Sequence, residues 1–233
     1  MIHLTDVTST NDWIAERSAS LADESWVRAD RQTAGRGRRG RVWTSDTGNL
    51  FASVWCRPQA FEGPSQQLSF VAALALDLAL QFHVPAERLS LKWPNDVLLD
   101  EVKCAGILLE SSGGGTIIGL GVNLAHHPDS SERPAISLPA AGFAAPDPAL
   151  FAEQLAGALS SLRQVWREGG FEPIRSRWLA RAAGRGCALQ ARMGSETIVG
   201  TFDDLAPDGA LLLRLPDGTI RAIHAGEVFG LAA

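Results

Sequence analysis

The stretch Leu89–Asn123, which reads LSLKWPNDVLLDEVKCAGILLESSGGGTIIGLGVN, decides the fold class of this chain. Four short runs within it have the alternating or continuous apolar pattern of β-strands. They are Leu89–Trp93, Val97–Leu99, Cys104–Ser111 and Thr116–Asn123. The segments between them are short turns, whereas parallel neighbours need a crossover connection of about a dozen residues. The stretch therefore predicts an antiparallel meander and excludes repeated βαβ units.

Helical patterns lie on both sides of this meander. Apolar residues recur at spacings of three and four in the ranges 64–84, 149–168 and 172–182, which predicts three helices with an apolar face. Two more strands, Ser25–Ala29 and Asn49–Arg57, come before the first of these helices. The segment from Ala125 to Pro148 is rich in Pro, Ala, Ser and Asp, so we expect a long surface loop there.

The C-terminal residues have a different pattern. After Gly184-Arg185-Gly186, short strand-like runs alternate with glycine-containing turns, which is typical of a small β-barrel. The runs are Cys187–Arg192, Thr197–Phe202, Ala210–Leu215 and Thr219–His224. We therefore expect an α+β protein with two domains, 1–184 and 185–233.

Composition limits the class of protein. The 233 residues are 45% hydrophobic and 20% charged, as in globular proteins, and no apolar run approaches the roughly 18 residues that cross a bilayer. The N-terminus has no export signal. Cys56, Cys104 and Cys187 are widely spaced and lack metal-ligand spacing, so we expect reduced, buried thiols in a cytoplasmic protein. A net charge of −5 argues against nonspecific binding of nucleic acid.

The Arg-Gly loop, residues Gln32–Trp43 with the sequence QTAGRGRRGRVW, is unsuited to a packed core. Its glycines allow close approach of the backbone to a ligand, and its arginines are forked donors for phosphate or carboxylate. The spacing also matches the dinucleotide fingerprint, but no helix pattern or acidic residue follows where that motif requires them, and no Walker A lysine is present. The loop is either an anion clamp or a solvated basic segment resembling an RNA tether.

Two lysines and one tripeptide outside the loop are further site candidates. Lys92 and Lys103 are the only lysines in a chain whose other basic residues are all arginines. A compact ammonium fits a tight pocket as a point charge, which a guanidinium cannot do. Ser9-Thr10-Asn11 precedes a short helical pattern, so it is a helix cap or, with its free N–H groups and hydroxyls, a site for a small polar ligand.

Five motifs in order resemble the biotin protein ligase family, the biotin–[acetyl-CoA carboxylase] ligases. They are Ser9-Thr10-Asn11, Gly35–Arg41, Leu91–Asp96, Lys103–Leu108 and Gly119–Asn123. The resemblance covers nearly the whole chain and implies a catalytic domain related to class II aminoacyl-tRNA synthetases, with a mixed, mostly antiparallel sheet, followed by an SH3-like β-barrel. It begins a few residues from Met1, so we expect no winged-helix domain, no repressor function and no DNA partner.

The resemblance implies two half-reactions. Biotin and MgATP give biotinoyl-5′-AMP and pyrophosphate, and a lysine amine of a biotin carboxyl carrier domain then displaces AMP. Biotin, ATP with Mg²⁺ and the carrier are therefore the expected ligands and partners, and many members of the family form homodimers. We expect no membrane partner.

Residue roles follow from the resemblance position by position. Arg38 and Lys103 are expected to be catalytic. The biotin side is expected to contain Ser9, Thr10, Asn11, Gln32, Arg36, Gly37, Arg38 and Lys103. The ATP side is expected to contain Arg36, Arg38, Arg41, Trp43, Lys92, Asn95, Asp96 and Asn123, with Asp96 helping to hold Mg²⁺.

Two other classes of protein, a lipoate-type ligase and an RNA-binding module, also fit some of these motifs. A lipoate-type ligase of the same fold would also adenylate a carboxylate, although its family lacks this Arg-Gly loop. A noncatalytic RNA-binding module would use the same arginines without chemistry. Cys104 lies next to Lys103 and could be a nucleophile, but no histidine adjoins it in sequence, so we expect a buried strand residue.

Overall fold

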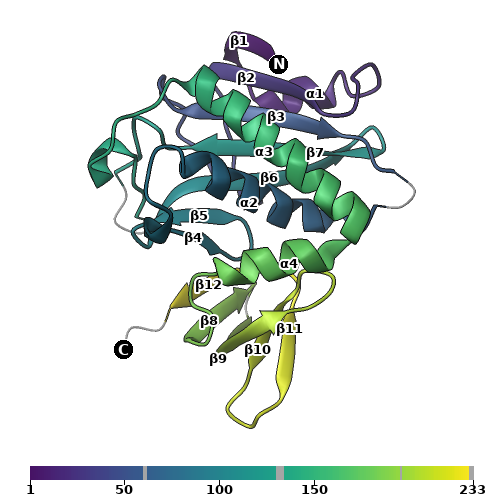
Figure 1. Ribbon diagram of the computed structural model, residues 1–233, viewed down its shortest axis with the longest axis vertical. Helices are drawn as coiled ribbons and strands as arrows, with labels where there is room; N and C mark the ends of the chain where they lie inside the picture. The colour runs from purple at the N-terminus through teal and green to yellow at the C-terminus, as the bar shows by residue number, and fades with distance from the viewer. Residues whose placement is uncertain (60–61, 130–133, 195, 231–233) are drawn as a thin grey trace.

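The computed structural model describes residues 1–59, 62–129, 134–194 and 196–230. Within them the chain forms a seven-stranded sheet in the order β1-β2-β3-β7-β6-β5-β4 and a five-stranded sheet in the order β11-β10-β9-β8-β12 (Figure 1). The first sheet contains β1 Ile2–Val7, β2 Ser25–Gln32, β3 Leu50–Cys56, β4 Leu89–Lys92, β5 Asp96–Leu99, β6 Val102–Ser112 and β7 Gly115–Val122. The second contains β8 Ala188–Met193, β9 Glu196–Leu205, β10 Leu211–Arg214, β11 Ile220–Ile223 and β12 Glu227–Gly230.

The pairing of the strands confirms the predicted meander. Strands β4, β5, β6 and β7 pair antiparallel in sequence order. Strand β3 joins the other side of β7, and β2 joins β3, again antiparallel. Only β1 and β2 run parallel among the described strands. The large sheet is therefore mixed and mostly antiparallel, and with the helices it confirms the predicted α+β class.

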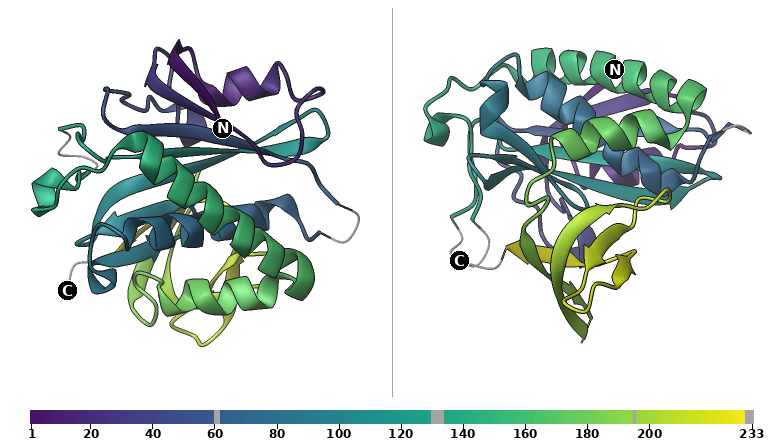
Figure 2. Two further views of the ribbon diagram at one scale, coloured as in Figure 1. Left: turned by 45° about the horizontal axis from the view of Figure 1, so that its top comes forward. Right: turned by 60° about the horizontal axis from the view of Figure 1, so that its bottom comes forward.

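Four α-helices accompany the sheets in the described ranges: α1 Thr10–Ala15, α2 Leu68–Leu80, α3 Pro148–Gly169 and α4 Phe171–Ala180. Single 3-10 turns occur at Arg38–Gly40, Ser65–Gln67, Ala86–Arg88 and Pro139–Ala141. Helices α2 and α3 cover one face of the large sheet, and α4 lies beside the second sheet (Figures 1 and 2). The side chain of Ser9 caps α1 by accepting from the N–H of Asp12, as its sequence pattern predicts.

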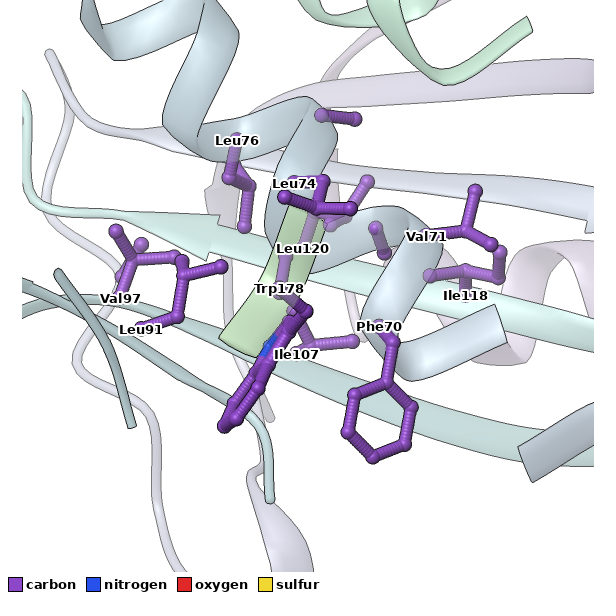
Figure 3. Close-up of a cluster of buried hydrophobic side chains, with 14 of the residues drawn as sticks. Phe70, Val71, Leu74, Leu76, Leu91, Val97, Ile107, Ile118, Leu120 and Trp178 are labelled. Atoms are coloured by element: carbon purple, nitrogen blue, oxygen red, sulfur yellow. The ribbon is translucent and has the colours of Figure 1, made fainter. Parts of the chain in front are cut away.

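The main core lies between α2 and the sheet (Figure 3). It combines side chains of α2, of the strands and of α4. Those labelled in the figure are Phe70, Val71, Leu74, Leu76, Leu91, Val97, Ile107, Ile118, Leu120 and Trp178, all of them buried. Because side chains alternate along a strand, the neighbours of these strand residues point to the opposite face of the sheet. On that opposite face, glycine and polar residues lie near the middle of the sheet, and a second apolar cluster of Ile14, Val27, Trp55 and Ile117 lies near α1.

Several expectations need correction. The strands β1 and β12 were not predicted, and β2 continues to Gln32. Helix α2 is shorter than the range 64–84, and two of the apolar residues that gave that range its helical spacing, Leu78 and Phe82, are exposed. The segment 125–148 does have little regular structure, although residues 130–133 lie outside the described part of the chain.

The cysteine prediction also needs correction. Cys56 and Cys104 are buried free thiols, as expected, but Cys187 is exposed. It lies at the start of the C-terminal sheet, just before β8, where the chain leaves the core of the large domain. Free cysteines are usually buried, but that tendency did not apply to Cys187.

A buried cation connects α3 to the loops around the large sheet. The Arg163 side chain has no exposed surface. Its guanidinium donates to Asp23 Oδ1 at 2.7 Å, Glu24 Oε1 at 3.3 Å, Glu62 Oε1 at 3.1 Å and the carbonyl of Arg57 at 2.9 Å. A buried charge of this kind is tolerated because acceptors surround it.

Replacing Arg163 with Met is expected to lower the free energy of unfolding by about 3–5 kcal/mol, because the carboxylates lose their buried partner. Urea denaturation measures the loss. The variant Arg214→Met is the control, since Arg214 pairs with Asp203 at the surface, and an exposed pair contributes at most about 1 kcal/mol. Equal losses in the two variants would contradict the argument.

The same network makes stability depend on pH. Desolvation alone would raise the pKa of Asp23, but hydrogen bonds from Arg163 and Arg167 outweigh it and hold that pKa below its usual value. A group whose pKa is lower in the folded state stabilises the fold above its unfolded pKa, and this contribution is lost as the pH falls through the folded pKa. Part of the acid sensitivity of the wild type should therefore be absent from Arg163→Met.

Candidate functional site

A cavity of about 580 Å³ lies on the sheet face opposite α2. It is bordered by the Arg-Gly loop, the start of α1, the β4–β5 hairpin, the glycine-rich parts of β6 and β7, and β12 of the second sheet. All the site residues predicted from the sequence line it. They are Ser9, Thr10, Asn11, Gln32, Arg36, Gly37, Arg38, Arg41, Trp43, Lys92, Asn95, Asp96, Lys103 and Asn123. The structure thus brings together predicted residues from five separate segments of the chain.

Three glycines form the floor of this cavity. A Cβ at Gly121 would lie 2.5 Å from the Trp43 ring, and one at Gly119 would lie 2.5 Å from Asn11 Oδ1. A Cβ at Gly106 would lie 3.0 Å from Trp43 and 3.2 Å from the Nζ of Lys103. Glycine therefore lets Trp43, Asn11 and Lys103 lie directly on the sheet. Sequence reasoning used these glycines only as parts of motifs and did not assign them to the site.

A polar network occupies the end of the cavity near α1. The backbone N–H and the hydroxyl of Thr10 donate to Gln32 Oε1 at 2.9 and 3.1 Å. The hydroxyl of Ser53 on β3 lies 2.7 Å from Thr10 Oγ1 and 2.5 Å from Asn11 Oδ1. Ser53 is fully buried and was missed by sequence reasoning. Its signal was a single hydroxyl in the otherwise apolar strand LFASVWC.

The Arg-Gly loop folds into a narrow hairpin over the cavity. Arg36 and Val42 form an antiparallel bridge, and the N–H of Gly37 donates to the carbonyl of Arg41 at 2.7 Å. The turn at its tip places Arg39 at φ +59° and Gly40 at φ +70°, and glycine adopts this region without a steric penalty. The loop lies between β2 and β3, so a strand of the large sheet holds it at each end.

The arginines of the loop have different partners. Arg36 pairs with carboxylates at the α1 side, and Arg41 pairs with Glu227 of β12. Arg38, in the described part of the chain, hydrogen-bonds only neutral oxygens, Asn95 Oδ1 at 3.2 Å and the carbonyl of Gly226 at 3.4 Å. Burial lowers the pKa of Arg38, and the adjacent Arg39 lowers it further. Arg38 is thus the loop cation that can bind an added anion at least cost.

Lys103 provides a second cation in the same cavity. Its Nζ lies 2.6 Å from Asp96 Oδ1 and 5.5 Å from the centroid of the Trp43 ring. The Asn95 amide, which accepts from Arg38, also donates to the carbonyl of Ile107 at 2.8 Å. Strand β6 and the β4–β5 hairpin therefore hold Lys103 and Arg38 in a fixed relation.

The second sheet contributes residues that sequence reasoning missed. Glu227, Val228 and Phe229 of β12 line the cavity. The Phe229 ring lies 5.7 Å from Lys92 Nζ and 4.6 Å from the guanidinium carbon of Arg192. The five-residue run Gly-Glu-Val-Phe-Gly has no motif that would have indicated this position.

The described carboxylates of the cavity do not form a dedicated metal site. The described residues contain no group of three or more His, Cys, Asp or Glu side chains arranged to hold an ion. Mg²⁺ that is bound to nucleotide phosphates keeps several waters and needs one or two protein carboxylates. Asp96 lines the cavity and fits that need, but a dedicated metal cage is not formed by the described side chains.

Cys104 is a core residue, as expected. It is completely buried, and its thiol donates to the carbonyl of Val97 at 3.4 Å. Burial raises the pKa of the Cys104 thiol to about 12. A protonated, inaccessible thiol is a poor nucleophile.

Among the described helices, none is long and apolar enough to span a bilayer.

Comparisons with known proteins agree with this geometry. A model of the biotin/lipoate A/B protein ligase family matches residues 1–125, and a model of the biotin protein ligase C terminal domain matches residues 184–230. A biotin–[acetyl-CoA-carboxylase] ligase of Paracoccus denitrificans is 44% identical, with 95% of this chain and 96% of the relative covered. One from Mycobacterium tuberculosis is 34% identical, with 96% and 86% covered.

A solved structure is similar over the same extent. The biotin protein ligase from Aquifex aeolicus, in complex with biotin and ATP, superposes with a TM-score of 0.84 at 29% identity. The match covers 98% of this chain and 97% of that one. The likeness therefore includes both the large sheet and the C-terminal sheet.

Proposed function

The chain belongs to the biotin/lipoate A/B protein ligase family, and we propose that it is a biotin protein ligase that uses ATP to load biotin onto a carboxyl carrier protein. In the first half-reaction the biotin carboxylate attacks the α-phosphorus of ATP, giving biotinoyl-5′-AMP and pyrophosphate. In the second, a lysine amine of the carrier attacks the mixed anhydride, forms an amide, and releases AMP and a proton.

One observation carries this proposal: Arg38 and Lys103 line the same cavity from opposite sides, the loop and the sheet. A carboxylate that approaches a polyphosphate is repelled by it, so catalysis depends on cations placed where the two anions meet. Arg38 has no carboxylate partner among the described residues, and Lys103 has one, Asp96. No covalent bond to the protein is needed, since the anhydride is the activated species.

We assign the two ends of the cavity to the two substrates. The network of Thr10, Asn11, Gln32 and Ser53 offers short donors and acceptors suited to a ureido ring. Lys92, Asn95, Asp96 and Asn123 line the other end, where the nucleotide would lie, with Trp43 as a stacking surface for adenine. ATP would bring Mg²⁺ with it, and Asp96 would hold the ion through one carboxylate.

An exchange assay tests the proposal. The protein is expected to catalyse biotin-dependent exchange of pyrophosphate into ATP and, with carrier protein present, to label one lysine. Lipoate in place of biotin and a polynucleotide shift assay are the comparisons. Exchange with lipoate alone would indicate the lipoate-type ligase, and polynucleotide binding without exchange would indicate an RNA-binding module.

The floor of the cavity gives a separate prediction. Replacing Gly121 with Ala places a methyl group within 2.5 Å of the Trp43 ring, so that ring must move off the sheet. We expect the KM for ATP to rise several-fold, with a smaller change in the KM for biotin, as measured by exchange kinetics. Gly157→Ala in α3 is the control, because its methyl would meet nothing within 4 Å. An unchanged KM for ATP would contradict the assigned stacking role.

The domain boundary, the cellular location and the absence of a nucleic-acid partner are also part of this proposal. We place the domain boundary at residue 184. We also propose that the enzyme is cytoplasmic, since ATP and the carrier are found there. It would have no nucleic-acid partner, because its net charge is −5.

A homodimer would form through β6, because β5 covers that strand only from Val102 to Gly106. Among the described strands, none pairs with the part of β6 after Gly106 on the side away from β7.

A further inference from the structure

The Arg36 guanidinium lies between two carboxylates that come from distant parts of the chain. Its two terminal nitrogens donate to both Asp12 oxygens, Nη1 to Oδ2 at 2.7 Å and Nη2 to Oδ1 at 2.6 Å. Its Nε donates to Glu110 Oε1 at 3.2 Å, and its Nη2 also donates to Glu110 Oε2 at 3.0 Å. All three nitrogens are therefore engaged by α1 and β6. Hydrogen bonds to Asp12, together with the charge of Glu110, raise the pKa of Arg36, so it stays charged.

Glu110 makes a second contact that reaches the cavity. Its Oε2 accepts from Asn11 Nδ2 at 2.6 Å, which turns Asn11 Oδ1 towards Ser53. Asn11 is buried and lies on Gly119, where no side chain competes with it. Charge-assisted bonds of this length are short and strong. One carboxylate thus sets the orientation of an amide in the cavity wall and anchors an arginine of the loop.

We infer that Glu110 is a positioning residue that completes the biotin end of the site by joining the Arg-Gly loop to Asn11. The inference rests on the proposed function. Arg36 forms one side of the bridge that closes the loop hairpin, opposite Val42, so its anchoring sets where Arg38 lies two residues later. Arg36 then acts as the anchor of the loop, and contact with the anionic substrates is left to Arg38 and Lys103.

A merely structural ion pair would behave differently. The side chains of Arg36, Asp12 and Glu110 are 31%, 40% and 32% exposed, and pairs this accessible to water contribute little to stability. Loss of Glu110 should therefore leave the melting temperature nearly unchanged. Its effect should appear in biotin binding and in retention of the adenylate.

The substitution Glu110→Gln separates these two roles. A glutamine amide has a single oxygen, so its NH₂ group must face either Arg36 or Asn11, both of which are donors. We expect the KM for biotin in the exchange assay to rise about tenfold, as for the loss of one charge-assisted bond. The KM for ATP should change less than about twofold, and free biotinoyl-AMP should be released faster.

Matched variants make the result decisive. Glu172→Gln removes a glutamate that pairs with Arg175 on α4, and it should leave all these constants unchanged. Arg36→Gln should raise the KM for biotin to a similar extent, and the double variant should be no worse than either single one, because the two residues act as a unit. Asp12→Asn weakens the same anchor from the α1 side and should give a smaller rise.

These measurements test the positioning role of Glu110 separately from the proposed ligase function. A normal KM for biotin in a stably folded Glu110→Gln protein would overturn the inference, and so would additive effects in the double variant. Parallel loss of biotin affinity, ATP affinity and melting temperature would reduce Glu110 to a structural residue. Absence of biotin-dependent exchange in the wild type and in Glu172→Gln would instead refute the proposed function.

Discussion

Replacing Lys103 with Arg is expected to lower biotin-dependent ATP–pyrophosphate exchange by about 100-fold or more, the loss seen when one preorganised group that stabilises transition-state charge is removed. The charge is kept in this variant, so the prediction concerns shape. Nζ of Lys103 lies between Asp96 and the Trp43 ring, above a glycine whose Cβ would lie only 3.2 Å away.

An arginine cannot use that space as a lysine does. Its planar guanidinium is larger than an ammonium and is directed by a fixed fork of donors. It would either displace Trp43 from Gly106 or turn away from the cavity, and in both cases the cation leaves the point where the anions meet. Exchange kinetics and the melting temperature measure the effect together.

Lys92→Arg is the matched comparison for this experiment. Lys92 Nζ lies 5.7 Å from the Phe229 ring, and an arginine can also stack on an aromatic ring, so we expect a loss below about tenfold. Near-normal exchange in Lys103→Arg would show that a point charge is not required there. Equal losses in the two variants would show that the cavity is sensitive to any bulky cation.

Replacing Arg38 with Gly is expected to keep adenylate formation measurable but to release biotinoyl-AMP, so that amines other than the carrier lysine become labelled. Arg38 connects the loop to the hairpin through Asn95 and to the second sheet through the carbonyl of Gly226. Without these bonds the Arg-Gly loop opens more often, and the reactive acyl-adenylate escapes or reacts with amines of other proteins. Labelling of a noncarrier protein, such as serum albumin, measures the release.

Arg39→Gly is the control for this variant. Arg39 neighbours Arg38, has a φ of +59°, which glycine adopts readily, and approaches a carboxylate only at 3.9 Å. It should retain labelling restricted to the carrier. If Arg38→Gly also labels only the carrier, the loop does not retain the intermediate, and its arginines serve the first half-reaction alone.

Sequence patterns predicted much of the fold, because strands, helices and turns depend on residues that lie close together in the chain. The alternation in Leu89–Asn123 indicated four strands, and all four are present with short connections. Strand β1 was missed because it is an edge strand with exposed residues on both faces, and it is held by parallel pairing with β2. Helix α2 is apolar on nearly every side, so periodicity could not show that Leu78 faces solvent, and the exposed Phe82 lies beyond the C-terminal end of the helix.

The candidate site shows the same limit. Motifs indicated every predicted residue that lines the cavity, since each motif is a local run of polar, glycine or basic residues. Ser53, Glu110 and Phe229 were missed because each stands alone in a strand, where one polar or aromatic residue has many ordinary explanations. The different partners of Arg36, Arg38 and Arg41 could not be read from a loop in which all three have the same chemistry.

The sequence by itself determined the α+β class, the order of most of the elements and many of the residues that line the cavity, because strand alternation, glycine turns and charged loops are local properties. Only the tertiary structure decided which arginine of the loop has no carboxylate partner among the described residues. Asp12, Glu110 and Glu227 neutralise Arg36 and Arg41 from α1, β6 and β12. Arg38 meets neutral oxygens instead. Pairing between charges depends on distances of a few ångströms across the fold, and no spacing along the chain specifies those distances.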